Sequence, residues 1–107
     1  MRRKRTYIEI GKAVSNNSKV MSSGETRYKC PCCGNFTFNK EPCGDYDICP
    51  VCFWEDDSAA ISDEDFEGGA NKVSLKQAKV NYLKYGAVEE RFIKNVRKPM
   101  PEEMNET

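Results

Sequence analysis

The stretch that decides the fold of this chain holds two cysteine motifs, Cys30-Pro31-Cys32-Cys33-Gly34 and Cys49-Pro50-Val51-Cys52. Each motif places two thiols three positions apart, and residues 34–48 separate Cys33 from Cys49. This spacing is typical of a zinc site in which two short turns each offer two thiolates. We therefore predict that one Zn²⁺ is bound by Cys30, Cys33, Cys49 and Cys52.

Cysteines at this spacing have other uses, namely a redox dithiol, an iron site, or no metal at all. Redox motifs of the C-x-x-C type usually occur singly and open a helix after a strand in a larger α/β domain, which this chain lacks. A closed site of four thiolates leaves no open position for water. We therefore expect the zinc to stabilise the fold and to perform no chemistry.

The two turns differ in the residue that follows their second ligand, which is Gly34 in the first and Phe53 in the second. Glycine readily adopts the positive φ that often ends such a turn. We therefore expect the second turn to leave by a different path, into a helical turn at residues 54–56. Two cysteines are left over, Cys32 and Cys43, and we predict that both are inert thiols rather than reactive groups or ligands of a second site.

The composition of the chain indicates that the fold needs a bound metal for stability. Only 19 of the 107 residues are Leu, Ile, Val or Phe, so the chain cannot bury a large core. The chain has no His, which excludes Ser-His-Asp and Cys-His catalysis, HExxH metalloproteases and Cys₂His₂ fingers. No apolar run approaches the roughly 18 residues that span a bilayer, and the basic start lacks the apolar core of a signal peptide. We expect a cytoplasmic protein that does not contact membranes.

The charge distribution divides the chain into three parts. Residues 1–29 carry eight basic and two acidic side chains, residues 30–70 one and ten, and residues 71–107 eight and five. The first part is rich in Ser and Asn and shows no sustained period. We predict a disordered basic arm over residues 1–27, a zinc-binding domain over 28–99, and a frayed acidic tail over 100–107.

Alternation and capping signals predict the elements of that domain. Apolar and polar residues alternate over 35–39 and over 45–48, with turn residues at 40–44 between them, which predicts a β-hairpin. Ser74 and Gln77 resemble a capping box, and apolar residues recur at helical spacing from Leu75 until Gly86, which predicts a helix. A second, shorter helix is expected over 88–96. The predicted fold class is a small α+β domain, a zinc-ribbon-like β-hairpin with one or two C-terminal helices.

Acidic residues gather at 55–57 and again at 63–67. Clustered carboxylates can hold magnesium for phosphodiester chemistry, but no nucleophile or arginine accompanies them in the local sequence. We predict a solvated charged loop rather than a catalytic site. Trp54 precedes the cluster, and we expect it to be a core or interface anchor.

Four strings in order, CPCCG, DICPVCFWEDD, GGANKVSLKQAKVNYLKYGA and ERFIKNVRKP, closely resemble the bacterial cysteine-rich CPCC domain. The resemblance covers residues 28–99. It implies a zinc-binding domain with Cys30, Cys33, Cys49 and Cys52 as ligands and implies no particular activity. It also marks residues 54–57 and 68–71 as family signatures, whereas Cys43 is not part of the usual pattern.

Taken together, these features predict a noncatalytic module that binds a partner protein, either near Trp54 or on a helix face. The first alternative is weak nucleic-acid binding through the basic arm and the helix lysines Lys72, Lys76, Lys79 and Lys84. The acidic centre of the chain would repel phosphates, which argues against that alternative. The second alternative is a hydrolase that holds a metal ion with Glu55, Asp56 and Asp57.

Overall fold

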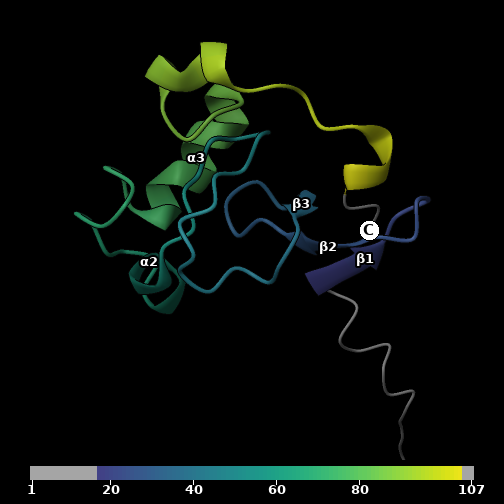
Figure 1. The fold of residues 1–107 in the computed structure, drawn as a ribbon. Helices are drawn as coiled ribbons and strands as arrows, with labels where there is room; N and C mark the ends of the chain where they lie inside the picture. The colour runs from purple at the N-terminus through teal and green to yellow at the C-terminus, as the bar shows by residue number, and fades with distance from the viewer. Residues whose placement is uncertain (1–16, 105–107) are drawn as a thin grey trace, which may run out of the picture.

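The structure is a computed structural model that describes residues 17–104. A three-stranded antiparallel sheet lies at one end, in the order β1 (Ser18–Val20), β2 (Thr26–Lys29) and β3 (Phe36–Phe38). Helices α2 and α3 lie at the other end, and chain without regular secondary structure connects the two parts (Figure 1). The predicted α+β class is therefore confirmed.

The strand pairing differs from the predicted hairpin. Residues 36–38 do form a strand, but its partner is β2 rather than residues 45–48, because the first cysteine motif reverses the chain between β2 and β3. In the second segment only Ile48 pairs, through an isolated bridge to Glu55. Tyr46 has a φ of 64°, which lies outside the β region and interrupts the extended conformation, so the alternation in this segment does not produce a strand.

The most distinct helix was predicted correctly. Helix α3 (Leu75–Tyr85) begins after Ser74, whose Oγ accepts a hydrogen bond from the N–H of Gln77 at 3.0 Å. It ends at Gly86, whose φ of 77° is the left-handed conformation that glycine adopts at little cost. The expected second helix is a 3₁₀ helix, η2 (Glu90–Asn95). The short helix α2 (Ser58–Ser62) was not predicted.

Both ends of the predicted domain extend further than expected. Strand β1 lies within the predicted basic arm, so the fold begins by Ser18; residues 1–16 of the arm lie outside the described residues. The acidic tail is also wrong as far as residue 104, because it forms the 3₁₀ helix η3 (Pro101–Glu103). Figure 1 shows η3 beside β1, where Glu102 Oε1 accepts a hydrogen bond from the N–H of Ser22 at 2.8 Å.

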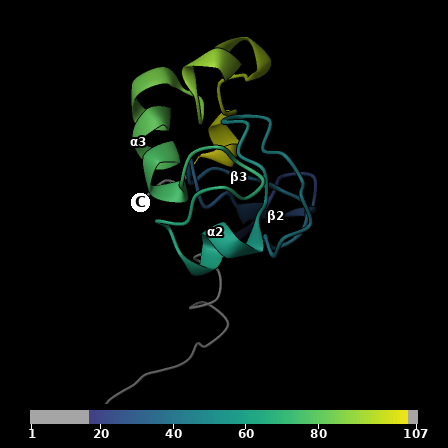
Figure 2. The same cartoon turned by 90° about the vertical axis from the view of Figure 1, so that its left-hand side faces the viewer.

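A small core joins the sheet to α3. Trp54 lies at its centre with 0% exposure and meets Phe38 of β3 edge to face, with ring centroids 6.4 Å apart. In the turned view of Figure 2, α3 and α2 flank the loops that carry the cysteines. Within residues 17–104 there is no helix both long and apolar enough to span a membrane.

Candidate metal centre

The first cysteine motif forms a tight turn between β2 and β3. The N–H of Gly34 donates to the carbonyl of Cys30 at 2.9 Å, and the N–H of Cys30 donates to the carbonyl of Asn35 at 2.8 Å. Gly34 has a φ of 80°, as the sequence led us to expect. This backbone arrangement directs the side chains of Cys30 and Cys33 toward the same point.

The second motif repeats that turn, contrary to our prediction of a different path. The N–H of Phe53 donates to the carbonyl of Cys49 at 2.8 Å, and the N–H of Cys49 donates to the carbonyl of Trp54 at 2.9 Å. Phe53 has a φ of 74°, a conformation that costs a residue with a Cβ about 1–2 kcal/mol. Its ring packs on Phe92 of η2 with centroids 4.6 Å apart, and such a pair contributes about 1 kcal/mol. The ring contact therefore offsets much of the strain at Phe53, so the second turn keeps the geometry of the first.

The two turns bring all four predicted ligands together. Their Sγ atoms lie within 4.8 Å of one another. Cys30 Sγ is 3.6 Å from Cys52 Sγ, and Cys33 Sγ is 3.8 Å from Cys49 Sγ. A tetrahedron with metal–sulfur bonds of about 2.3 Å has edges of about 3.8 Å, whereas a disulfide has a bond of about 2.05 Å. The sulfur positions therefore fit a tetrahedral metal ion, and all the cysteines are free thiols.

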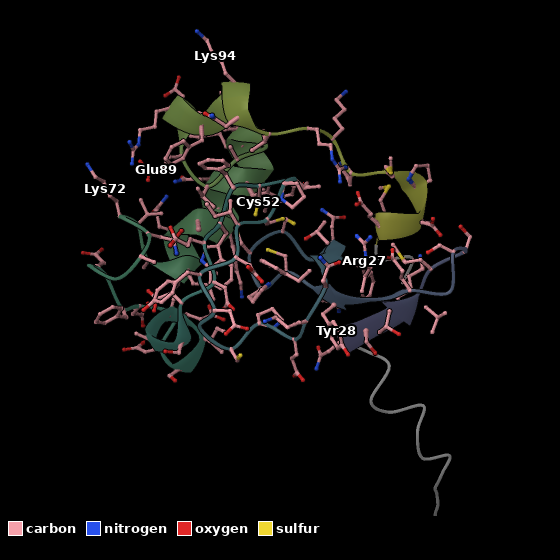
Figure 3. All side chains as sticks on the ribbon, viewed as in Figure 1. Arg27, Tyr28, Cys52, Lys72, Glu89 and Lys94 are labelled. Atoms are coloured by element: carbon pink, nitrogen blue, oxygen red, sulfur yellow. The ribbon has the colours of Figure 1, made fainter. Side chains whose placement is uncertain are left out.

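The centre is enclosed by protein. Cys30, Cys49 and Cys52 have 0% exposure, and Cys33 is half-buried. Figure 3 shows Cys52 between α3 and the sheet. Burial raises the pKa of Cys30 well above its usual value, whereas hydrogen bonding to the neighbouring sulfurs, Cys30 first, lowers the pKa of Cys49. A divalent cation binds the thiolate forms and would neutralise charge that burial otherwise disfavours.

One neighbour of the centre was missed from the sequence. Thr37 of β3 is buried, and its Oγ1 lies 3.1 Å from Cys49 Sγ. A hydroxyl can donate to a thiolate, and such second contacts orient metal ligands. The only sequence signal was its position between Phe36 and Phe38, which placed it on the opposite face of the strand from the two rings.

The two remaining cysteines occupy different environments. Cys32 is buried in the core, next to the first turn. Cys43 is exposed, and its Sγ lies 3.5 Å from an oxygen of Asp45. Neither thiol belongs to the four-sulfur cluster.

The predicted solvated loop is wrong for its first acidic residues. Asp56 is 1% exposed, and its Oδ2 accepts hydrogen bonds from the N–H groups of Cys43 at 3.0 Å and Asp45 at 2.9 Å. Asp57 Oδ1 accepts from the N–H of Ala59 at the start of α2, and its Oδ2 accepts from the N–H of Ala70 at 2.9 Å. These carboxylates hold backbone together. The later group at 63–67 is exposed, as predicted.

The same contacts explain the two signatures on either side of α2. The Asn71 side chain pairs with the backbone of Glu55, accepting from its N–H at 2.9 Å and donating to its carbonyl at 2.8 Å. A Cβ at Gly69 would overlap Asp57 Oδ2, so glycine is required there. Residues 54–57 and 68–71 therefore form one structural clasp beside the second cysteine turn.

These motifs, in this order, match the model of one protein family. A family model described as Cysteine-rich CPCC matches residues 28–103. The chain belongs to this family. The match includes η3, whereas β1 precedes it, so this CPCC domain ends a few residues later than the predicted boundary at 99. A search of curated proteins found no matching relative.

Proposed function

We propose that this CPCC protein binds one Zn²⁺ through Cys30, Cys33, Cys49 and Cys52. The observation that carries the proposal is the cluster of four sulfurs at tetrahedral spacing. Sulfur-only donors in a closed tetrahedron favour zinc or iron, and zinc is the usual occupant of a ribbon with paired C-x-x-C turns. Elemental analysis of protein purified without added metal should find one zinc per chain, and an iron absorption band would contradict it.

The zinc has a structural rather than a catalytic role in this proposal. Four thiolates fill the tetrahedral shell, and three of the four sulfurs belong to fully buried residues. The hydrolase alternative is less favoured, because three oxygens of Asp56 and Asp57 already accept hydrogen bonds from backbone N–H groups. We expect no magnesium-dependent phosphodiesterase activity. Turnover by the wild type that is lost in Asp57→Asn would contradict this.

We further propose that the protein binds a partner protein through the exposed face of α3. Leu83 is 86% exposed and Val80 is 55% exposed, one helical turn apart. A separate groove of about 270 Å³ lies at the C-terminal end of α3, lined mainly by apolar side chains of that end and of the segment after it: Tyr82, Tyr85, Ile93, Val96 and Pro99. The site near Trp54 that we also predicted is less favoured, because Trp54 is fully buried.

Nucleic-acid binding remains the alternative outcome of the test. On α3, Lys79 pairs with Glu64 at 2.8 Å, which reduces the basic character of the helix. Of the predicted basic arm, residues 1–16 lie outside the described residues, and Arg27 pairs with Glu25 at 2.7 Å.

Crosslinking in cells and affinity capture separate the two interpretations. Leu83→Ser should remove a specific protein partner, whereas the neighbouring Lys84→Ser should not, and capture should persist in high salt. Nucleic acid would behave differently, because phosphate contacts weaken steeply with salt. Its retention would be lost when Arg2, Arg3, Lys4 and Arg5 are replaced by Ser in the full chain.

A further inference from the structure

The loop before the second cysteine turn wraps around one buried carboxylate. Asp56 Oδ2 accepts hydrogen bonds from the N–H groups of Cys43 and Asp45, and the Asp56 carbonyl accepts one from the N–H of Tyr46 at 3.1 Å. The N–H of Asp56 in turn donates to the carbonyl of Asp47 at 2.8 Å. These four bonds fix the backbone positions of Cys43 and Asp45 relative to Asp56.

The side chains of these residues converge. The Sγ of Cys43, one carboxylate oxygen of Asp45 and one of Asp56 all lie within 4.8 Å of one another. None of them is a member of the four-sulfur centre. A thiol and a carboxylate from the fixed loop at 43–45 and the carboxylate of the buried Asp56 thus share one small volume.

The buried carboxylate has an oxygen with no partner. Asp56 is 1% exposed, and within residues 17–104 its Oδ1 has no hydrogen bond. A buried acceptor without a partner costs about 1–3 kcal/mol, and more if it is charged. Lys40 Nζ lies 3.2 Å from Asp45, but its side chain is 68% exposed, so it neutralises Asp45 only weakly and leaves Asp56 unpaired. A cation bound between the three side chains would balance the charge of the buried Asp56 carboxylate and reduce the repulsion between the two carboxylates.

We propose that Cys43, Asp45 and Asp56 form a second cation site that binds a borderline divalent ion such as Zn²⁺, in place of the inert role that the sequence predicted for Cys43. One thiolate among the ligands favours Zn²⁺ over Mg²⁺ and Ca²⁺, which prefer oxygen alone. Three protein ligands leave the fourth tetrahedral position to water, so this site is open where the four-sulfur site is closed. The site goes beyond the structural zinc proposed above and does not depend on it.

The test uses the full chain, loaded with its resident metal and dialysed before further Zn²⁺ is added. Calorimetry should show a second equivalent that binds more weakly than the first. The same Zn²⁺ should slow the alkylation of Cys43 by iodoacetamide, because Cys43 is the exposed thiol among the six cysteines. Asp45→Asn should weaken the binding of the second Zn²⁺ about tenfold or more. Loss of a group that merely contacts a metal ligand already lowers metal affinity by about that factor. The matched control is Asp47→Asn, which removes the same charge from the same exposed loop and should leave binding unchanged.

Cys43→Ser gives a second variant that does not threaten the fold, because the side chain is exposed and the Cys43 N–H remains available to Asp56. It should abolish the second equivalent and leave the resident metal in place. Three results would overturn the proposal: no second equivalent at millimolar Zn²⁺, unchanged binding in Cys43→Ser, or equal weakening by Asp45→Asn and Asp47→Asn. The last result would mean that Zn²⁺ binds a diffuse acidic surface.

Discussion

The two cysteine turns have the same backbone hydrogen bonds but different supports. The first turn joins β2 to β3, so a sheet holds both of its ends, and Gly34 adopts the positive φ. The second turn has no strand on either side, only the bridge between Ile48 and Glu55 and the hydrogen bonds of Asp56 to the facing segment, and it places Phe53 in the same conformation. The same metal-binding turn can therefore form either between two paired strands or where no strand adjoins it.

Distant segments replace the missing sheet at the second turn. The N–H of Val88 donates to the carbonyl of Cys52 at 2.8 Å, and the N–H of Arg97 donates to the carbonyl of Pro50 at 3.3 Å. Phe92 packs on Phe53 from the same C-terminal region. The second turn is thus tied to residues far along the chain, so we expect it to depend on tertiary structure more than the first turn does.

Substitution of a metal ligand should have the largest effect on stability, and the effect should be the same in both turns. Cys33→Ser and Cys52→Ser should each unfold the domain, because a structural zinc contributes on the order of 10 kcal/mol to folding. Circular dichroism with and without a chelator checks this. Cys32→Ser is the matched control in the first turn, and it should retain the metal. A variant of one turn that stays folded without metal would show that the sheet alone supports it.

The clasp beside the second turn should give the next largest effect. Gly69→Ala would place a Cβ against Asp57 Oδ2, and overpacking of this kind costs about 1–3 kcal/mol. Urea unfolding measures the loss. In an Asp57→Ala background the same substitution should cost much less, since the clashing oxygen is absent. Equal costs in both backgrounds would contradict the contact.

The docked C-terminal segment should make stability depend on pH. Hydrogen bonding from Arg97 lowers the pKa of Glu103, which is 4% exposed, below its usual value of about 4.3. A carboxyl group with a lowered pKa stabilises the fold above its unfolded pKa, and this contribution is lost as pH falls through the folded pKa. Glu103→Gln should therefore cost about 2 kcal/mol at neutral pH.

Melting curves from neutral to acidic pH test this prediction. The difference between wild type and Glu103→Gln should shrink below about pH 4, because both proteins then carry an uncharged group. Glu102→Gln is the matched control; Glu102 is exposed, so its substitution should have a smaller effect. A difference that stayed constant across this range would rule out the charged pair as its source.

Substitutions that change backbone strain should have the smallest effect on stability. They also compare the two turns directly. Gly34→Ala should cost about 1–2 kcal/mol, although a Cβ there would meet no neighbour within 4 Å. In the second turn, Phe53→Gly should be more stable than Phe53→Ala by about 1 kcal/mol, because both lose the contact with Phe92 but only alanine keeps the strain. Equal stability of the last two proteins would show that Phe53 is not strained.

The sequence predicted what depends on local chemistry. Ser74 and Gly86 act through neighbours a few positions away, and each cysteine pair lies within one short turn, so α3 and the ligand set followed from spacing. Prediction from the sequence failed where contacts between distant residues determine the structure. Nothing near Phe53 reveals that Phe92 packs on it, and nothing near Asp56 reveals that the loop at 43–45 binds its carboxylate. The pairing of β3 with β2 was missed because alternation shows that a segment can be a strand and does not identify its partner.

The central claim is that both turns contribute equally to one closed metal centre. X-ray absorption at the zinc edge of the purified protein tests it most directly. We predict one zinc per chain with four sulfur neighbours at about 2.3 Å and no nitrogen or oxygen neighbour. Two sulfur neighbours completed by oxygen, or a protein without metal, would show that the two turns do not share an ion.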